Sequence, residues 1–236
     1  TGSMCLEPEP IAENIANLCG IFRAAAAHAG IRPRKLVFGA GFGIPYHAGQ
    51  TDLDIAAVRA LVEPHIRALA ASPDLGGAER MLELGRWITG PCGALVTRVL
   101  SVKESRGLGI AVCDAGFNNH LAACGMMGAV FQKNYPIVPL RRSAAGPEAG
   151  RPRGYMLAGP LCTSIDQLAR RIELPELRRG DLLAVLMSGA YGLTASPTRF
   201  ISHPEPAEYL LEGGRLTDIS ESRLNRLGSR VPELAQ

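Results

Sequence analysis

The stretch KLVFGAGFGIPYHAG, from Lys35 to Gly49, decides how the first part of the chain folds. Its apolar start is typical of a short buried strand, which passes directly into Gly39, Gly41 and Gly43. Glycines at the end of a strand leave backbone N–H groups uncovered, so the loop can approach a phosphate closely. The same loop also suits a tight turn between a strand and a helix. The order of elements would suit a dinucleotide fold, but the GxGxxG spacing is absent.

Helices and strands alternate on both sides of this loop. Apolar residues three and four positions apart predict one helix over about residues 11–29 and another from about residue 55, with Thr51 or Asp52 as its N-cap. A further short strand is predicted at RMLELG, residues 80–85. This alternation is the pattern of a parallel α/β sheet or barrel.

The chain becomes β-rich after Gly90, and we place a domain boundary there, giving residues 1–91 and 92–236. Residues 93–116 read as two strands joined by a polar turn at 104–107. More strands are predicted within residues 135–140, 154–161, 181–189 and 207–213. Residues 164–177 are predicted to form a short helix that Thr163 or Ser164 caps, and residues 141–154 a surface loop.

Composition excludes several classes of partner. The net charge of +3 is small, and no stretch concentrates Lys or Arg with aromatic residues, so we expect no nucleic-acid partner. No apolar run is long enough to span a bilayer, so no membrane partner is expected. The 6 cysteines are scattered without a CxxC pair, which is typical of reduced thiols in the cytoplasm and indicates neither a metal site nor a disulfide framework.

Three further motifs carry reactive side chains. Glu83 and Arg86 lie in ELGR after a predicted strand, where they form either a surface ion pair or a grip on a charged cofactor. Cys162 follows an apolar strand in AGPLCTSID, and an isolated cysteine of this kind is usually inert. Tyr191 lies between glycines in MSGAYGLTASP, in a loop that can present its hydroxyl group.

In this order and spacing, the motifs resemble the fold-type III pyridoxal-phosphate decarboxylases, the ornithine/diaminopimelate/arginine decarboxylase family. The resemblance covers essentially the whole chain but only the later part of the family's sequence. It implies an α/β fold in which part of an alanine-racemase-like (β/α)₈ barrel precedes a C-terminal, mostly β domain of β-barrel type. It also implies pyridoxal 5′-phosphate as the cofactor.

The resemblance assigns a phosphate loop to Gly39, Gly41 and Phe42, with Ala40 where a third glycine is usual. Ser3, in the opening TGSM, resembles a serine that contacts the same phosphate. ELGR matches the family's E-P-G-R motif.

That motif implies Glu83 on the pyridine nitrogen and Arg86 near the phosphate. A carboxylate at the nitrogen keeps the ring protonated, so that it can act as an electron sink. The Gly-Ala-Tyr motif implies a phosphate contact from Tyr191, made across a dimer interface.

The family's G-P-x-C motif matches residues 159–162 and implies that Cys162 is the catalytic residue that reprotonates the substrate carbanion in the partner subunit's site. We therefore expect a homodimer with shared active sites. Asp114, His120 and Asp166 are the candidate substrate-binding residues. Loop packing is an alternative for His120, and helix capping is an alternative for Asp166. Thr163 stands where ornithine- and diaminopimelate-type enzymes carry an acid.

The lysine that binds the cofactor as a Schiff base has no match here. The chain's 3 lysines, Lys35, Lys103 and Lys133, lie elsewhere in the pattern. A histidine that stacks on the cofactor ring is also expected ahead of Thr1. We therefore expect the chain to be a C-terminal portion with half a barrel, inactive alone.

The predicted function is pyridoxal-phosphate-dependent α-decarboxylation of an amino acid, as a small-molecule substrate, or of a carrier-protein-linked amino-acyl derivative. A diaminopimelate or ornithine decarboxylase proper, and a non-catalytic homologue that acts as a binding partner, are the alternatives. A racemase is disfavoured by the G-P-x-C motif. A nucleotide-binding α/β domain fused to a β module explains the glycines but leaves Glu83, Arg86 and Cys162 without roles.

Overall fold

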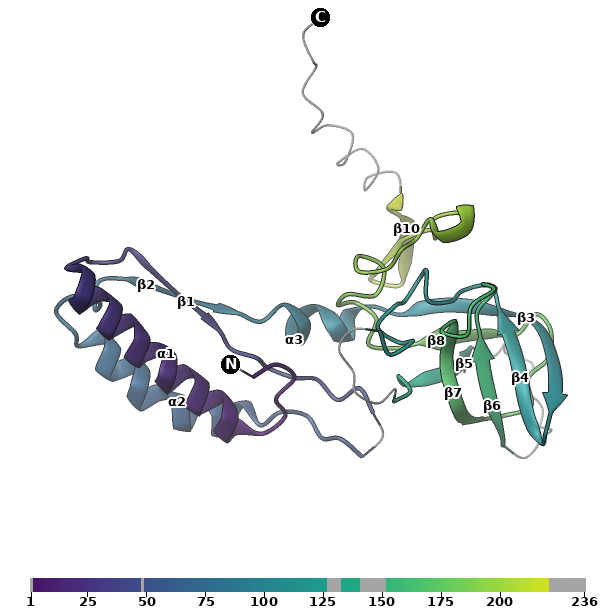
Figure 1. Cartoon of the computed structure of the whole chain (residues 1–236), viewed down its shortest axis with the longest axis horizontal. Helices are drawn as coiled ribbons and strands as arrows, with labels where there is room; N and C mark the ends of the chain where they lie inside the picture. Colours follow the sequence, from purple (N-terminus) through teal and green to yellow (C-terminus); the bar gives the residue numbers. More distant parts are fainter. Residues whose placement is uncertain (1, 48, 127–132, 141–151, 221–236) are drawn as a thin grey trace, which may run out of the picture. The chain divides into compact units, whose positions relative to one another are not determined.

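The computed structural model describes residues 2–47, 49–126, 133–140 and 152–220 (Figure 1). It divides the chain into two compact units, Thr1–Ser196 and Pro197–Gln236. Most of the predicted surface loop, residues 141–151, lies outside the described residues. The boundary that we placed near residue 91 falls within the first unit and stays a prediction.

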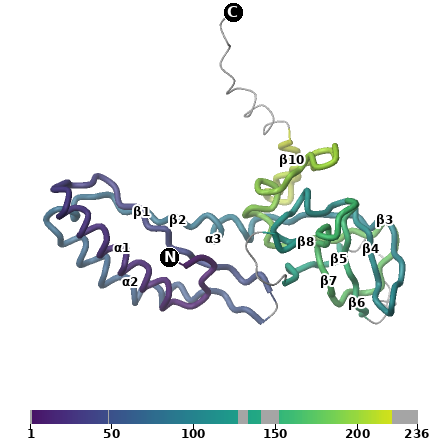
Figure 2. The backbone as a smooth tube through the Cα atoms, viewed as in Figure 1, coloured from purple at the N-terminus to yellow at the C-terminus, as the bar shows by residue number. Residues whose placement is uncertain are grey.

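The first part of the larger unit has the predicted alternation of helix and strand. Its elements are α1 (Pro8–Ala29), β1 (Lys35–Gly39), α2 (Ile55–Ala70) and β2 (Glu79–Glu83). β1 and β2 pair in parallel, and α1 and α2 lie side by side along them (Figure 2). Apolar side chains from both helices and from β1 share one core, which includes Ile11, Ile15, Leu36, Phe38, Val58 and Leu69.

The start of α2 differs from the prediction. Its N-cap is Asp54, whose side chain accepts a hydrogen bond of 3.0 Å from the backbone N–H of Ala57. Leu53, immediately before it, is buried in the same core, so residues 51–53 run extended and the helix begins only after them. Thr51 and Asp52 are therefore not the cap. Two short helices, α3 (Gly85–Thr89) and η1 (Gly90–Cys92), follow β2.

The rest of the larger unit is a six-stranded mixed sheet in the order β5-β8-β3-β4-β6-β7. β3 pairs with β8 through its first residues and with β4 through its last, so one strand joins the two halves of a curled sheet. The predicted turn between β3 and β4 is confirmed. The strands are β3 (Leu95–Ser105), β4 (Leu108–Cys113), β5 (Ile137–Leu140), β6 (Arg153–Ala158), β7 (Gln167–Leu174) and β8 (Leu182–Val185).

The helix predicted over residues 164–177 is wrong, because β7 occupies this position and pairs antiparallel with β6. Leu168 and Ile172 are four residues apart, which imitates helical spacing. In the structure, however, Leu168 and Ala169 are both fully buried in the sheet core, and Tyr155 of β6 faces Ile172. Neither Thr163 nor Ser164 caps a helix.

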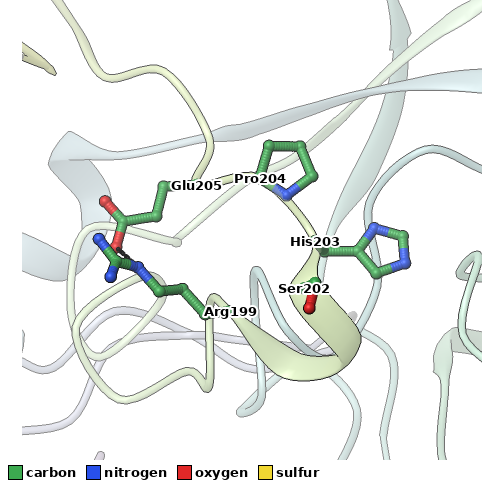
Figure 3. Close-up of a pocket in the computed structure, with 5 residues that line it drawn as sticks. All are labelled: Arg199, Ser202, His203, Pro204 and Glu205. Atoms are coloured by element: carbon green, nitrogen blue, oxygen red, sulfur yellow. Dashed lines mark hydrogen bonds and ion pairs between the residues drawn. The ribbon is translucent and has the colours of Figure 1, made fainter.

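The smaller unit contains η2 (Phe200–Ser202) and a hairpin of β9 (Tyr209–Glu212) and β10 (Arg215–Asp218). The strand predicted at residues 207–213 is confirmed by β9. A pocket of this unit is lined by Arg199, Ser202, His203, Pro204 and Glu205 (Figure 3). Arg199 and Glu205 form an ion pair there, with Nε and Oε1 3.0 Å apart. Among the described residues, no helix combines the length and apolar character needed to cross a bilayer. The same residues hold no cluster of three or more metal-ligating side chains.

Candidate functional site

The site begins where β1 and β2 end. Gly39 and Glu83 are the last residues of the two strands and lie opposite each other in the parallel register. The carboxyl edge of parallel strands is where α/β proteins commonly bind ligands. The side-chain amide of Asn14 donates a hydrogen bond of 2.9 Å to the Gly39 carbonyl, which ties this edge to α1.

The glycine loop packs against the segment Gly2–Cys5. Cys5 N–H donates to the Gly41 carbonyl at 3.0 Å, and Gly43 N–H donates to the Cys5 carbonyl at 2.8 Å. A side chain at Gly41 would collide with the Gly2 carbonyl, and Gly41 has a φ of +71°. The glycines therefore allow two backbone segments to meet, which the sequence did not reveal.

This packing leaves a set of donors beside the strand ends. Within the part of the chain that the structure describes, the N–H groups of Gly41 and Phe42 and the hydroxyl of Ser3 have no hydrogen-bond partner. The Cα atom of Ser3 lies against Gly41, 3.7 Å from the position that a Cβ would take. Backbone N–H groups and a serine hydroxyl are the donors that a phosphate group accepts in loops of this kind.

Arg86 lies next to this edge, with its guanidinium group near two aromatic rings. Its Cζ atom lies 4.8 Å from the ring centre of Tyr191 and 5.7 Å from that of Tyr46, both within the range of a cation–π contact. Its Nη1 atom also donates a hydrogen bond of 3.2 Å to the Tyr46 hydroxyl. Arg86 and Glu83 do not pair among the ion pairs of the described residues, so the surface ion-pair alternative is wrong.

The loop that carries Tyr191 is fixed to the segment after Arg86. Ser188 N–H donates to the Gly93 carbonyl at 2.8 Å, and Gly189 N–H donates to the Gly90 carbonyl at 3.1 Å. Tyr191 itself has a φ of +61°, a strained conformation for a residue with a side chain. The Tyr191–Arg86 contact is thus made within one chain, and the expected role of Tyr191 across a dimer interface stays a prediction.

Asp166, one of the predicted substrate-binding residues, is buried and hydrogen-bonded to the backbone. Its side chain is 3% exposed, and its two carboxylate oxygens each accept a backbone hydrogen bond of 2.7 Å, from Phe117 and Leu161. A side chain at either Gly116 or Gly159 would collide with this carboxylate. The capping alternative is wrong because no helix starts here, and Asp166 instead holds two loops together.

His120 and Asp114 differ in accessibility. His120 is fully buried, its Nδ1 accepts from Ala123 N–H at 3.2 Å, and burial lowers its pKa to about 4. This burial supports the loop-packing alternative. Asp114 is exposed, and one of its oxygens accepts from the Thr97 hydroxyl at 2.7 Å and from Arg98 N–H at 2.8 Å. Its second oxygen accepts no hydrogen bond among the described residues.

Cys162 is exposed on the loop between β6 and β7. Two other thiols of the sheet, Cys113 and Cys124, are buried, and burial raises the pKa of each to about 12. No hydrogen bond or ion pair of the described residues joins Cys162 to Glu83, Arg86 or Tyr191. The structure thus groups the predicted cofactor residues at one edge and leaves Cys162 outside that group.

Comparison with known proteins decides which family has this arrangement. Residues 24–189 match the family model described as the C-terminal sheet domain of pyridoxal-dependent decarboxylases. The chain belongs to the pyridoxal-dependent decarboxylases. The family's relatives are pyridoxal-phosphate-dependent enzymes, so the family that we expected from the motifs is confirmed.

Two curated decarboxylases are similar along most of the chain. The L-glutamyl-[BtrI acyl-carrier protein] decarboxylase of Niallia circulans is 33% identical over 216 residues, 91% of this chain and 49% of that protein. A diaminopimelate decarboxylase of Methanothermobacter thermautotrophicus is 32% identical over 220 residues, 93% of this chain and 49% of that protein. The chain thus spans about half the length of these decarboxylases.

A solved structure agrees with this assignment. The crystal structure of diaminopimelate decarboxylase from Helicobacter pylori complexed with L-lysine has a TM-score of 0.74 and 25% identity, covering 96% of this chain and 53% of that one. The curled mixed sheet of this chain is consistent with the sheet domain of the decarboxylase family.

One residue beside Arg86 was not predicted from the sequence. Tyr46 is buried, lies four residues after Phe42 and contacts Arg86 directly. The signal was present in GIPY, where a tyrosine follows the glycine loop, but no periodicity distinguishes a core tyrosine from one that faces a site.

Proposed function

We propose that the complete protein is a pyridoxal-phosphate-dependent α-decarboxylase that acts on an amino acid or on a carrier-linked amino-acyl derivative. The observation that carries this proposal is the meeting of the glycine loop, Glu83, Arg86 and Tyr191 at one edge of β1 and β2. Residues 1–91 would then be part of a (β/α)₈ barrel that the remainder of the protein completes. The unpaired cysteines support a reducing compartment, the cytoplasm.

The donor set fits the cofactor. The free N–H groups of Gly41 and Phe42, the Ser3 hydroxyl and the Arg86 guanidinium would hold the phosphate, with the Tyr191 hydroxyl as a further donor. The exposed Glu83 carboxylate, on the neighbouring strand end, would pair with the pyridine nitrogen. Pyridoxal phosphate, when bound, supplies an electron sink for the electron pair that remains after loss of carbon dioxide.

Cys162 would deliver a proton to the substrate. Its Sγ is accessible to solvent, unlike those of Cys113 and Cys124. We propose that this thiol serves the site of a second subunit, so that a homodimer has shared active sites. Asp114, with one unpaired and exposed carboxylate oxygen, is the substrate-side residue that the structure supports best.

The substrate class follows from a missing charge. Thr163 occupies the place next to Cys162 where a free diamino acid would need a carboxylate to hold its distal ammonium group. The burial of Asp166 removes the other carboxylate of the loop that carries Cys162. The similarity to a decarboxylase whose substrate is attached to a carrier protein also supports an amino-acyl derivative without a free distal amine. Diaminopimelate is the competing substrate, because several relatives decarboxylate it.

The test is an intact-mass measurement on the complete protein after incubation with pyridoxal phosphate and borohydride. One reduced pyridoxyl adduct per chain, followed by release of carbon dioxide from a carrier-bound glutamyl thioester, supports the proposal. Release from diaminopimelate alone supports the competing substrate. Absence of an adduct refutes the proposed decarboxylase activity and favours a non-catalytic homologue that acts as a binding partner.

A further inference from the structure

Three buried rings lie in contact with one another, and one of them, Tyr46, also contacts Arg86. Tyr46 and Tyr135 have ring centres 4.6 Å apart, and His120 meets Tyr135 edge-on at 4.9 Å. Tyr46 is 2% exposed, Tyr135 is 7% exposed and His120 is fully buried. They come from the loop after β1, from the segment before β5 and from the loop after β4. We call these three side chains the buried aromatic column.

The column meets Arg86 through one polar atom. The Tyr46 hydroxyl accepts a hydrogen bond of 3.2 Å from Arg86 Nη1. Burial and then the neighbouring Tyr46, partly through a hydrogen bond, raise the pKa of Tyr135. The ring of Tyr135 packs against that of Tyr46, so the tyrosine that meets Arg86 is itself held by a second buried ring.

The backbone around the column is held in place. Asn134, the residue before Tyr135, accepts from Arg170 N–H at 3.1 Å and donates to the Arg171 carbonyl at 2.7 Å, so it is fixed to β7. Its own carbonyl accepts from His47 Nδ1 at 3.0 Å. His47 is the residue after Tyr46, so the two tyrosines are joined through their neighbours as well as through the contact of their rings.

We propose that Tyr46 is a positioning residue for Arg86. Its hydroxyl fixes the direction of the guanidinium group, and Tyr135 packs against the Tyr46 ring. A free arginine side chain has many rotamers, and ordering it on ligand binding costs free energy. With Tyr191 over its face and Tyr46 at Nη1, Arg86 is ordered before the phosphate arrives. The inference rests on the proposed function, because the phosphate is that of pyridoxal phosphate.

The experiment compares two tyrosine hydroxyls in the complete protein by titration with pyridoxal phosphate. Tyr46→Phe keeps the ring and removes the acceptor of Arg86, and we expect the dissociation constant to rise about tenfold. Tyr155→Phe is the matched control, because Tyr155 is 1% exposed and its hydroxyl accepts from Leu177 N–H at 3.0 Å in the sheet core. It should lower thermal stability but change the dissociation constant less than about twofold.

A double-mutant cycle separates positioning from a general structural role. The Arg86→Lys background lacks the planar guanidinium group. In that background, Tyr46→Phe should weaken cofactor binding less than about twofold further, because Tyr46 acts through Arg86. If Tyr46→Phe weakens binding by the same factor in both backgrounds, or no more than Tyr155→Phe does, the positioning role is overturned while the proposed function stands. If the unmodified protein does not bind pyridoxal phosphate, the proposed function fails, and this inference fails with it.

Discussion

The carboxylate of Asp166 fills the space that a side chain at Gly159 would need. Gly159 opens the GPLC motif, and Asp166 lies four residues after its cysteine. The same carboxylate accepts from Leu161 N–H, the residue next to Cys162, at 2.7 Å. The glycine of the motif is therefore required by packing, and the buried aspartate sets the backbone that presents the thiol.

Adding a methyl group at Gly159 tests this relationship. We expect Gly159→Ala to lower the free energy of unfolding by about 2 kcal/mol, because the new Cβ forces a buried carboxylate away from its two donors. Gly20→Ala is the matched control, since Gly20 lies in α1 with open space around it, and there alanine should stabilise by about 0.5–1 kcal/mol. Urea denaturation of both variants gives the comparison. Equal effects at the two positions would contradict the packing requirement.

Two variants separate the contributions that the ring and the hydroxyl group of Tyr191 make to cofactor binding. Tyr191→Phe should weaken pyridoxal-phosphate binding by about tenfold through loss of the proposed hydrogen bond to the phosphate, and Tyr191→Leu by more, since the cation–π contact with Arg86 is also lost. Tyr209→Leu, at an exposed tyrosine of β9, is the control and should leave binding unchanged. Spectroscopic titration of the complete protein measures all three. Tyr191→Leu with unchanged affinity would remove Tyr191 from the cofactor site.

Cys162→Ala should reduce the turnover number at least about tenfold, since a positioned proton donor typically contributes 10²–10⁴-fold. Cofactor affinity and thermal stability should not change, because Cys162 is exposed and has no hydrogen-bond partner among the described residues. Cys92→Ala removes the other exposed thiol and serves as the control. A normal rate with the normal product in Cys162→Ala would exclude the catalytic role.

Mixing two inactive variants tests whether the sites are shared. Cys162→Ala and Arg86→Met each remove one component, and in a shared-site dimer a hybrid contains one site with both native residues. Unfolding and refolding the two variants together should restore about one quarter of the native activity, because half of the dimers are hybrids with one working site. Each variant refolded alone is the control. No recovery in the mixture would place Cys162 and Arg86 in the same subunit's site.

Burial of His120 makes stability depend on pH. Its pKa is lowered to about 4 in the folded protein, whereas an unfolded histidine has about 6.5, so between these values the unfolded state binds more protons. Stability is therefore lost as pH falls, and we expect about 2 kcal/mol less at pH 5 than at pH 7 from this group. His120→Gln should remove that part of the difference in urea denaturation, and His28→Gln, at an exposed position, should not. An unchanged pH dependence in His120→Gln would contradict the assignment.

The sequence predicted most of the fold where one pattern had one interpretation. The alternation of α1, β1, α2 and β2 follows from periodicity, and the turn between β3 and β4 from its polar residues. β7 was missed because Leu168 and Ile172 have a spacing that suits a helix as well as a strand. Only the pairing with β6, which is a long-range contact, decides between them.

The placement of Gly39 and Glu83 side by side at strand ends could be predicted because their motifs are local, while their roles toward a cofactor stay predictions. The burial of His120 and Asp166 could not be predicted, because exposure depends on loops that are far apart in sequence. Asp166, for example, accepts from Phe117, which is 49 residues away along the chain. Tyr46 was missed for the same reason, since its contact with Arg86 spans 40 residues.

The double pairing of β3 has a consequence for local unfolding. Its first residues are bonded to β8 and its last to β4, so neither half of the sheet can open without breaking bonds to this strand. The amide protons of β3 should therefore exchange with solvent only through the largest cooperative opening of the sheet. The hairpin of β9 and β10, whose residues are all exposed, should exchange far earlier.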